Sequence, residues 1–275
     1  MASIRAVYQK PLSTLDSLGE ELAFYVKALA WTPRTVRRYK KEILRILAEV
    51  TLGSGSLAVI GGTVGVITAM CFFTGTEVGL QGYAALNQLG TAAFSGFVSA
   101  YFNTREIAPL VAGIALAATV GCGFTAQLGA MRISEEVDAL EVMAIPSLPF
   151  LVTTRIIGGL IAIIPLYVVG LLSSYFATRL TVTGFFGQST GTFDHYFNQF
   201  LPPGDVLWSF GKVLVFAVTV ILIHCYHGYT ASGGPAGVGV AVGRAVRTSI
   251  VAINVIDLFL SMAIWGTTTT VRLAG

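Results

Sequence analysis

Residues 107–131 read IAPLVAGIALAATVGCGFTAQLGAM, a run of 25 residues without a charged side chain. A helix needs about 20 mostly apolar residues to cross the hydrocarbon core of a bilayer. Charge is equally absent from four other runs, 50–76, 78–104, 156–178 and 213–243, and Asp257 alone interrupts a last run at about 248–271. Because the runs lack the alternating pattern of a membrane β-barrel, we predict an all-α integral membrane protein.

The composition of the whole chain supports this class. Of the 275 residues, 54% are hydrophobic and only 11% are charged. Soluble globular proteins carry about 25% charged residues, so a soluble enzyme and a disordered protein are both excluded. A net charge of +3 is too small to indicate a nucleic-acid partner, and we expect none.

The first 50 residues differ from the rest. Residues 13–30 carry apolar side chains at helical spacing, and nine of the 17 cations of the chain lie within residues 1–50. An apolar stripe followed by clustered cations suits the anionic surface of the cytoplasmic leaflet. We therefore expect residues 1–50 to form an amphipathic, basic interfacial region, with the N-terminus in the cytoplasm.

Two topologies fit the remaining chain. A five-span arrangement has spans at about 52–76, 89–130, 150–178, 207–231 and 248–270, whereas in a six-span arrangement 78–104 and 107–131 both cross. Each arrangement places thirteen cations inside and four outside, so the positive-inside rule does not choose. In the five-span arrangement the second span would be a helix of 42 residues, about 63 Å long, and it would have to be broken, tilted or protruding. Pro109 is a candidate break.

A short acidic segment separates two of the apolar runs. Glu135, Glu136, Asp138 and Glu141 place four carboxylates within seven residues, and the apolar residues between them recur at helical spacing. This pattern predicts a short helix with one apolar side. A surface that docks a protein partner is the favoured interpretation, and acid–base or metal chemistry and a plain solvated loop are the alternatives.

Three further charges lie inside apolar runs. Arg105 and Glu106 interrupt an otherwise uncharged stretch from 78 to 131, and Asp257 is alone in the last run. Ionisable residues at membrane depth usually pair or face a cavity. Arg105 and Glu106 could form a polar gate or pocket wall that meets a polar ligand group. The alternatives are a hairpin end at the interface and an ion pair that only locks helices together. Asp257 is a possible transmembrane polar site, either a protonatable transport residue or a paired one.

We predict no catalytic, metal or cofactor site in this chain. His224, Cys225 and His227 lie in an apolar run and have no acidic partner nearby in the sequence. Gly211-Lys212 does not meet the phosphate-loop pattern, because Val213 follows the lysine.

Several of these segments together resemble the MlaE/YrbE permeases, the membrane subunits of ABC lipid transporters that work with MCE proteins. The resemblance rests on an ordered set of motifs: GLQGY at 79–83, REIAP at 105–109, EEVDALEVM at 135–143, Lys212-Val213, YHGY at 226–229 and DLF at 257–259. The basic N-terminal region resembles the actinobacterial YrbE type. Ala108 and Ala144 depart from positions where the family commonly has glycine.

The resemblance implies five spans with the C-terminus outside, in the bacterial plasma membrane, and a permease domain over 51–275. It implies that the acidic segment is the cytoplasmic coupling helix between the second and third spans. The expected contacts to the ATPase are Glu135, Glu136, Asp138, Leu140, Glu141 and Met143, and the expected lipid-binding residues are Leu80, Tyr83, Arg105 and Glu106.

The resemblance also implies the partners and the activity. ATP and Mg would be bound by a separate ATPase subunit, and a second YrbE permease chain would complete a heterodimer with a lipid cavity between the two copies. Extracellular MCE-domain proteins would deliver fatty-acid, mycolate or sterol-like lipids for import. The alternative is a proton-coupled secondary lipid transporter that uses Glu106 or Asp257.

Overall fold

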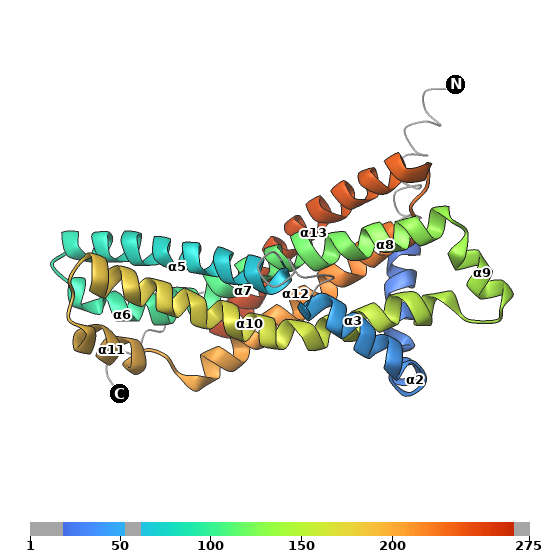
Figure 1. Cartoon of the computed structure of the whole chain (residues 1–275). Coiled ribbons are helices and arrows are strands. Elements are labelled where there is room, and N and C mark those ends of the chain that lie inside the picture. Colours follow the sequence, from blue (N-terminus) through green and yellow to red (C-terminus); the bar gives the residue numbers. More distant parts are fainter. Residues whose placement is uncertain (1–18, 53–61, 267–275) are drawn as a thin grey trace, which may run out of the picture.

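The computed structural model describes residues 19–52 and 62–266, and these are helical almost throughout (Figure 1). A first helix covers residues 19–30. The further elements are α2 (Thr32–Arg38), α3 (Lys40–Leu52), α5 (Thr63–Gln88), η1 (Ala92–Phe94), α6 (Ser95–Val98), η2 (Ser99–Ile107), α7 (Ala108–Leu116), η3 (Ala117–Gly121), α8 (Cys122–Ile133), α9 (Glu136–Val142), η4 (Leu148–Thr153), α10 (Thr154–Leu180), η5 (Thr181–Phe185), α11 (Thr190–Gln199), α12 (Pro203–Tyr229) and α13 (Gly234–Trp265).

Within residues 19–52 and 62–266, five helical stretches are long and apolar enough to cross a membrane. They are Thr63–Gln88, Ala92–Ile133, Leu148–Phe185, Pro203–Tyr229 and Gly234–Trp265. The all-α class and the five-span arrangement are therefore confirmed at the level of the helices. The six-span arrangement is wrong, because residues 92–133 form a single long helical stretch and residues 78–88 complete the span before it.

The predicted ends of two spans are wrong. The first long helix runs from Thr63 to Gln88 instead of 52–76, with residues 53–61 outside the described part, and the last begins at Gly234 instead of 248. The helices continue through Glu77, which follows the predicted first span, and through Arg244 and Arg247, which precede the predicted last span. Long charged side chains can reach the polar interface while their helix stays partly in lipid.

The second span of 42 residues contains Pro109 without ending there. The π-helical segment η2 ends at Ile107, and Pro109 occupies the first turn of α7. Local π-type adjustment lets a membrane helix carry a proline, because it provides other partners for the freed backbone groups. The helix therefore changes from π-helical to α-helical winding just before Pro109, and the predicted break does not occur there.

Helices α5 and α10 lie side by side (Figure 1), and their backbones approach each other closely. A Cβ atom added to Gly75 would lie 2.4 Å from the carbonyl oxygen of Ser174. Thr178 Oγ1 donates a hydrogen bond to the carbonyl oxygen of Gly75 at 2.7 Å, and Ser173 Oγ donates one to that of Thr68 at 3.1 Å. Small residues allow such close approach between membrane helices, and the hydrogen bonds across the interface stabilise it further.

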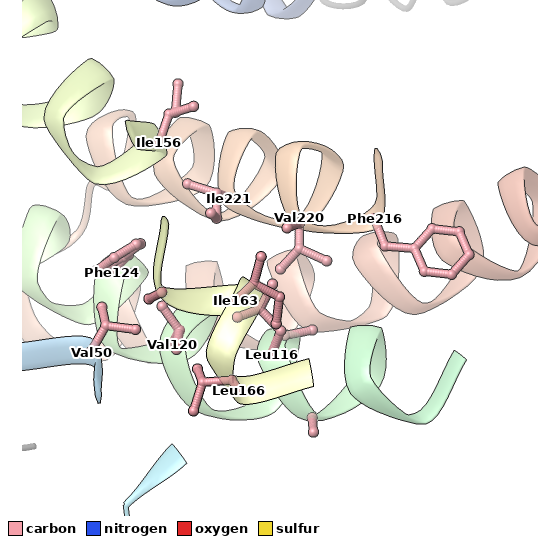
Figure 2. Close-up of a cluster of buried hydrophobic side chains, with 14 of the residues drawn as sticks. Val50, Leu116, Val120, Phe124, Ile156, Ile163, Leu166, Phe216, Val220 and Ile221 are labelled. Atoms are coloured by element: carbon pink, nitrogen blue, oxygen red, sulfur yellow. The ribbon is translucent and has the colours of Figure 1, made fainter. Parts of the chain in front are cut away.

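The apolar core is built by side chains from several spans. Leu116, Phe124, Ile163 and Val220 come from α7, α8, α10 and α12 and are all buried, and Figure 2 shows them gathered around α10. Because lipid is as apolar as these side chains, dispersion in a close-packed interior is what holds this core together.

The N-terminal helix packs on one end of the bundle. It runs roughly crosswise to α8 and α10 (Figure 1), and the rings of Phe24 and Tyr25 contact Tyr226 at centroid distances of 5.4 and 6.0 Å. Thr153 Oγ1 donates a hydrogen bond to the carbonyl oxygen of Ala28 at 2.9 Å. The predicted helix is thus confirmed over residues 19–30, and its residues 13–18 lie outside the described part. The boundary at residue 50 stays a prediction.

Candidate functional site

The acidic segment forms a helical turn that projects from one end of the bundle. Helix α9 lies between α8 and the start of the third span, at the far end of Figure 1 from α6 and α11. Val137 is its only buried residue, and Leu140 is half-buried against the core. The rest of the predicted set, Glu135, Glu136, Asp138, Glu141 and Met143, is exposed. The structure therefore brings the predicted contact residues together on one accessible surface.

This surface combines carboxylates with an apolar tip. Arg132 Nη1 lies 2.6 Å from Asp138 Oδ1, and Ser134 Oγ donates to Glu136 Oε1 at 3.1 Å. Val142 and Met143 at the end of α9 are 88% and 61% exposed. Exposed apolar side chains rimmed by charge are typical of an interaction surface.

The end of α9 is closed by hydrogen bonds within its own backbone. Ala144 N and Ile145 N donate hydrogen bonds to the carbonyl oxygens of Glu141 and Leu140 at 3.0 and 2.9 Å, which is a Schellman ending. Ala144 consequently has a φ of +58°, in the left-handed region that favours glycine. This geometry gives a physical reason for the glycine that the family commonly has at this position.

A side-chain relay joins α9 to the end of the fourth span. Ser147 Oγ donates to Glu141 Oε1 at 2.7 Å and lies 2.7 Å from Tyr229 Oη. Phe24 packs against the ring of Tyr229 at 5.6 Å. These contacts join α9 to both α12 and the N-terminal helix.

The second candidate region is a cluster of charges between three spans, centred on Lys212. The side chain of Lys212 is completely buried, and its Nζ donates hydrogen bonds to the carbonyl oxygen of Arg105 at 2.7 Å and to Ser261 Oγ at 2.8 Å. Asp257 Oδ1 lies 2.7 Å from Nζ and Glu106 Oε2 lies 3.3 Å away. Ser261 Oγ donates to Glu106 Oε1 at 2.8 Å. The ammonium thus connects η2, α12 and α13.

Arg105 belongs to a neighbouring pair rather than to Glu106. Its Nη2 lies 2.6 Å from Asp205 Oδ2, and its guanidinium stands 4.1 Å from the ring centre of Tyr101. Trp265 Nε1 donates to the other oxygen of Asp205 at 3.0 Å. The expected Arg105–Glu106 ion pair is therefore wrong, because consecutive helical residues point in different directions and find different partners.

The cluster holds two cations and three carboxylates within the described residues. Arg105, Glu106 and Asp257 were predicted, whereas Lys212, Asp205, Ser261 and Trp265 were missed as site residues. One signal could have found Lys212, because it stands alone among apolar residues nine positions into its span. The pairing of Asp257 favours the paired interpretation of this residue over the solitary one.

Leu80 and Tyr83 lie near the C-terminal end of α5. The ring of Tyr83 stacks on Phe186 with 4.2 Å between the centroids, and Leu80 is half-buried. Among the described contacts, none joins Leu80 or Tyr83 to Arg105 or Glu106. The four predicted lipid-binding residues are thus divided between two places on one chain.

No group of three His, Cys, Asp or Glu side chains in residues 19–52 and 62–266 could hold a metal ion. His224 is buried, and its Nδ1 lies 2.8 Å from Thr125 Oγ1, which makes it a packed core residue.

Comparisons with known proteins identify relatives over most of the chain. A profile of the family described as "Permease MlaE" matches residues 54–263. A protein of Rickettsia bellii named "Probable ABC transporter permease protein" is 29% identical over 196 residues, covering 71% of this chain and 76% of that protein. The chloroplastic TRIGALACTOSYLDIACYLGLYCEROL 1 of Arabidopsis thaliana is 31% identical over 200 residues, which cover 70% of this chain and 56% of that protein. The "Intermembrane phospholipid transport system permease protein MlaE" of Haemophilus influenzae is 27% identical over 195 residues, covering 70% of this chain and 75% of that protein.

Proposed function

The chain belongs to the MlaE family of ABC transporter permeases, and on that premise we propose that it is the membrane subunit through which an ATP-driven transporter moves lipids. The H. influenzae relative is named as a phospholipid transport permease, which supports a lipid substrate. An ABC permease works with a separate ATPase, so ATP and Mg belong to the partner. The single observation that carries the proposal is helix α9, which presents charge and apolar side chains beyond the spans.

Helix α9 would be the coupling helix of this transporter. Its exposed carboxylates suit cations of an ATPase groove, and Val142 and Met143 would fill an apolar pocket there. Because Ser147 and Tyr229 connect α9 to α12, closure of the ATPase would move the fourth span.

Reversing the charge of three carboxylates tests this docking. Glu135→Lys, Glu136→Lys and Asp138→Lys together should abolish co-purification of the ATPase and lipid-stimulated ATP hydrolysis. The neutral set Glu135→Gln, Glu136→Gln and Asp138→Asn controls for the local contacts to Ser134 and Arg132 and should weaken both activities less. Full co-purification and activity in the charge-reversed variant would refute the docking.

A second permease copy would complete the lipid cavity. Only 11% of the most apolar stretch of α13 is buried, against 56% in the third span, so α13 offers a long face to lipid or to another chain. The resemblance to the YrbE type favours a heterodimer. Cysteine cross-linking at Val251 and Val255 should trap the second copy, and mass spectrometry of the product tells a homodimer from a heterodimer. The absence of any cross-link between two permease chains would refute this interface.

The lipid would meet Leu80, Tyr83, Arg105 and Glu106 in that cavity. Arg105→Ala should reduce lipid-stimulated ATP hydrolysis while the assembled complex still forms. Asp205→Asn is the matched control, because it breaks the same ion pair and leaves the guanidinium in place. Equal losses in both variants would mean that the pair only holds the helices.

In more detail, we propose that the transporter imports fatty-acid, mycolate or sterol-like lipids together with extracellular MCE-domain proteins. The chain would lie in a plasma membrane with its N-terminus in the cytoplasm and its C-terminus outside. A pull-down followed by mass spectrometry tests the partners, and the accessibility of a C-terminal tag tests the orientation. Lipids that co-purify with the complex would identify the substrate class.

One observation favours a second candidate, a proton-coupled transporter. Asp257 and Glu106 share Lys212 between three spans, and carboxylates so placed can exchange protons during transport. Uptake that survives ATP depletion and stops with a protonophore would favour this candidate over the ATP-driven one.

A further inference from the structure

A polar pocket lies between the end of α12 and the first turns of α13, on the α9 side of the bundle (Figure 1). Its volume is about 230 Å³. That leaves room for a small polar group, since a water molecule takes up about 30 Å³ of the liquid. Small residues keep this space open, because Gly237 and Ala241, one turn apart on α13, both line it. Neither the charge cluster at Lys212 nor the surface of α9 includes this pocket.

The wall of this pocket contains a cation without an internal counter-charge. Arg244 lines the pocket, and no ion pair within residues 19–52 and 62–266 engages its guanidinium. Side chains of a helix lean toward its N-terminus, so that of Arg244 leans toward the end of α13 at which the pocket lies. Ser232, in the turn before α13, adds a hydroxyl group to the wall. The pocket therefore offers hydrogen-bond donors, one of them charged, to an anionic group.

Two hydrogen-bond acceptors line the same pocket, on the side of α12. They belong to His227 and Thr230. His227 Nδ1 lies 2.9 Å from the carbonyl oxygen of Ile223. Because a carbonyl oxygen only accepts, Nδ1 carries the proton, and Nε2 of the neutral ring is an acceptor. Thr230 Oγ1 donates to the carbonyl oxygen of Tyr226 at 2.8 Å, which leaves its lone pairs to accept. A bare phosphate would match the arginine and leave both acceptors unused, whereas a ligand that also carries hydroxyl groups would match all three.

We propose that this pocket binds a phosphorylated polyol, the headgroup of an anionic phospholipid such as phosphatidylglycerol in the leaflet on the α9 side. The phosphate would contact the guanidinium of Arg244, whose paired N–H groups match phosphate oxygens. The hydroxyl groups of the headgroup would donate to His227 and Thr230. Val240 lines the pocket and is 53% exposed, so it provides an apolar edge from which the acyl chains would follow α13 into the bilayer. The proposal is independent of the transporter function.

Binding of dioleoyl phosphatidylglycerol to the purified full-length chain in a neutral detergent tests the phosphate contact. Native mass spectrometry measures the affinity. Arg244→Gln should lower it by about tenfold or more, because hydrogen bonds between two charged groups are lost. Arg247→Gln is the matched control, since this arginine is also exposed and lies one turn further along α13, outside the pocket. It should change the affinity less than about threefold.

A comparison of two lipids tests the hydroxyl contacts. Dioleoyl phosphatidylethanol has the same chains and the same single charge as phosphatidylglycerol, but its headgroup has no hydroxyl group. The original chain should therefore prefer phosphatidylglycerol. His227→Phe keeps a ring and removes the Nε2 acceptor, so it should weaken phosphatidylglycerol binding about fivefold and leave phosphatidylethanol binding unchanged. A variant that only disturbed the local structure would weaken both lipids alike.

The outcomes separate the possibilities. Equal losses in Arg244→Gln and Arg247→Gln would overturn the proposal in favour of diffuse attraction to the charged surface. Equal binding of the two lipids by the original chain, or equal losses of both in His227→Phe, would overturn recognition of the hydroxyl groups. Glycerol 3-phosphate that displaces the lipid at micromolar concentration, and loses this ability in Arg244→Gln, would support the phosphorylated polyol and assign the pocket to a soluble ligand instead of a lipid.

Discussion

The substitution Lys212→Met removes the cation that connects three spans and keeps an unbranched side chain of similar length. It leaves Asp257 and Glu106 without their common ammonium and deletes the hydrogen bonds to the carbonyl oxygen of Arg105 and to Ser261. The two carboxylates do not contribute equally. Asp257 is closer, at 2.7 Å against 3.3 Å, and its side chain is 14% exposed against 38% for Glu106.

The magnitude follows from these two differences. Removing one partner of a buried ion pair costs about 3–5 kcal/mol, because the other charge stays buried. Since Asp257 is the main charge left buried, we expect Lys212→Met to lower the free energy of unfolding by about 3 kcal/mol. Glu106→Gln should cost less than about 1 kcal/mol, because its pair is longer and more exposed and the amide can still accept from Ser261.

Unfolding by SDS in mixed lipid–detergent micelles, followed by circular dichroism, measures these differences. The decisive variant is Lys212→Met with Asp257→Asn, in which the uncompensated carboxylate is gone. It should recover more than half of the loss of the single variant. A double variant no more stable than Lys212→Met, or a single variant within about 1 kcal/mol of the original chain, would refute the idea that this ion pair holds the three spans together.

Further substitutions test three other contacts by the same measurement. Gly75→Ala should destabilise the chain by about 1–3 kcal/mol, because the new methyl group meets the backbone of Ser174. The control Gly211→Ala has no atom within 4 Å of the new methyl group and should stabilise the chain by about 0.5–1 kcal/mol. The opposite order of stabilities would contradict the close packing of α5 on α10. Ala144→Gly should add about 0.5 kcal/mol, since the left-handed conformation is unfavourable for alanine, and a loss of stability would argue against the Schellman ending. Trp265→Phe should cost about 1 kcal/mol by removing the hydrogen bond to Asp205, and the loss should disappear when Asp205 is already Ala.

The spans were predictable because lipid imposes a simple requirement. A long run without charge has to become a helix there, and residues 107–131 met that requirement on sequence alone. The ends of the spans were less predictable, since Glu77, Arg244 and Arg247 are charged and still helical. A side chain that reaches the interface leaves the backbone hydrogen bonds of its helix intact, so charge does not mark where a helix ends.

The two candidate regions also differ in how far the sequence predicted them. Helix α9 was predictable because its carboxylates lie within seven consecutive residues. The cluster at Lys212 joins residues more than 100 positions apart, so it depends on how three spans pack. Adjacency in sequence suggested that Arg105 pairs with Glu106, whereas helix geometry sends them to Asp205 and Lys212.

The close contact of α5 with α10 also limits how this protein can change shape. With the Gly75 backbone against Ser174 and the Thr178 hydroxyl bonded to it, the two helices have no room to slide or rotate past each other. We therefore expect the two helices to move as one rigid body, so that a transport cycle would move other boundaries, such as that between this body and α13. Spin labels placed on α5 and α10 would therefore keep a constant separation through the cycle, and they provide a fixed internal reference frame for measuring the motion of the other spans.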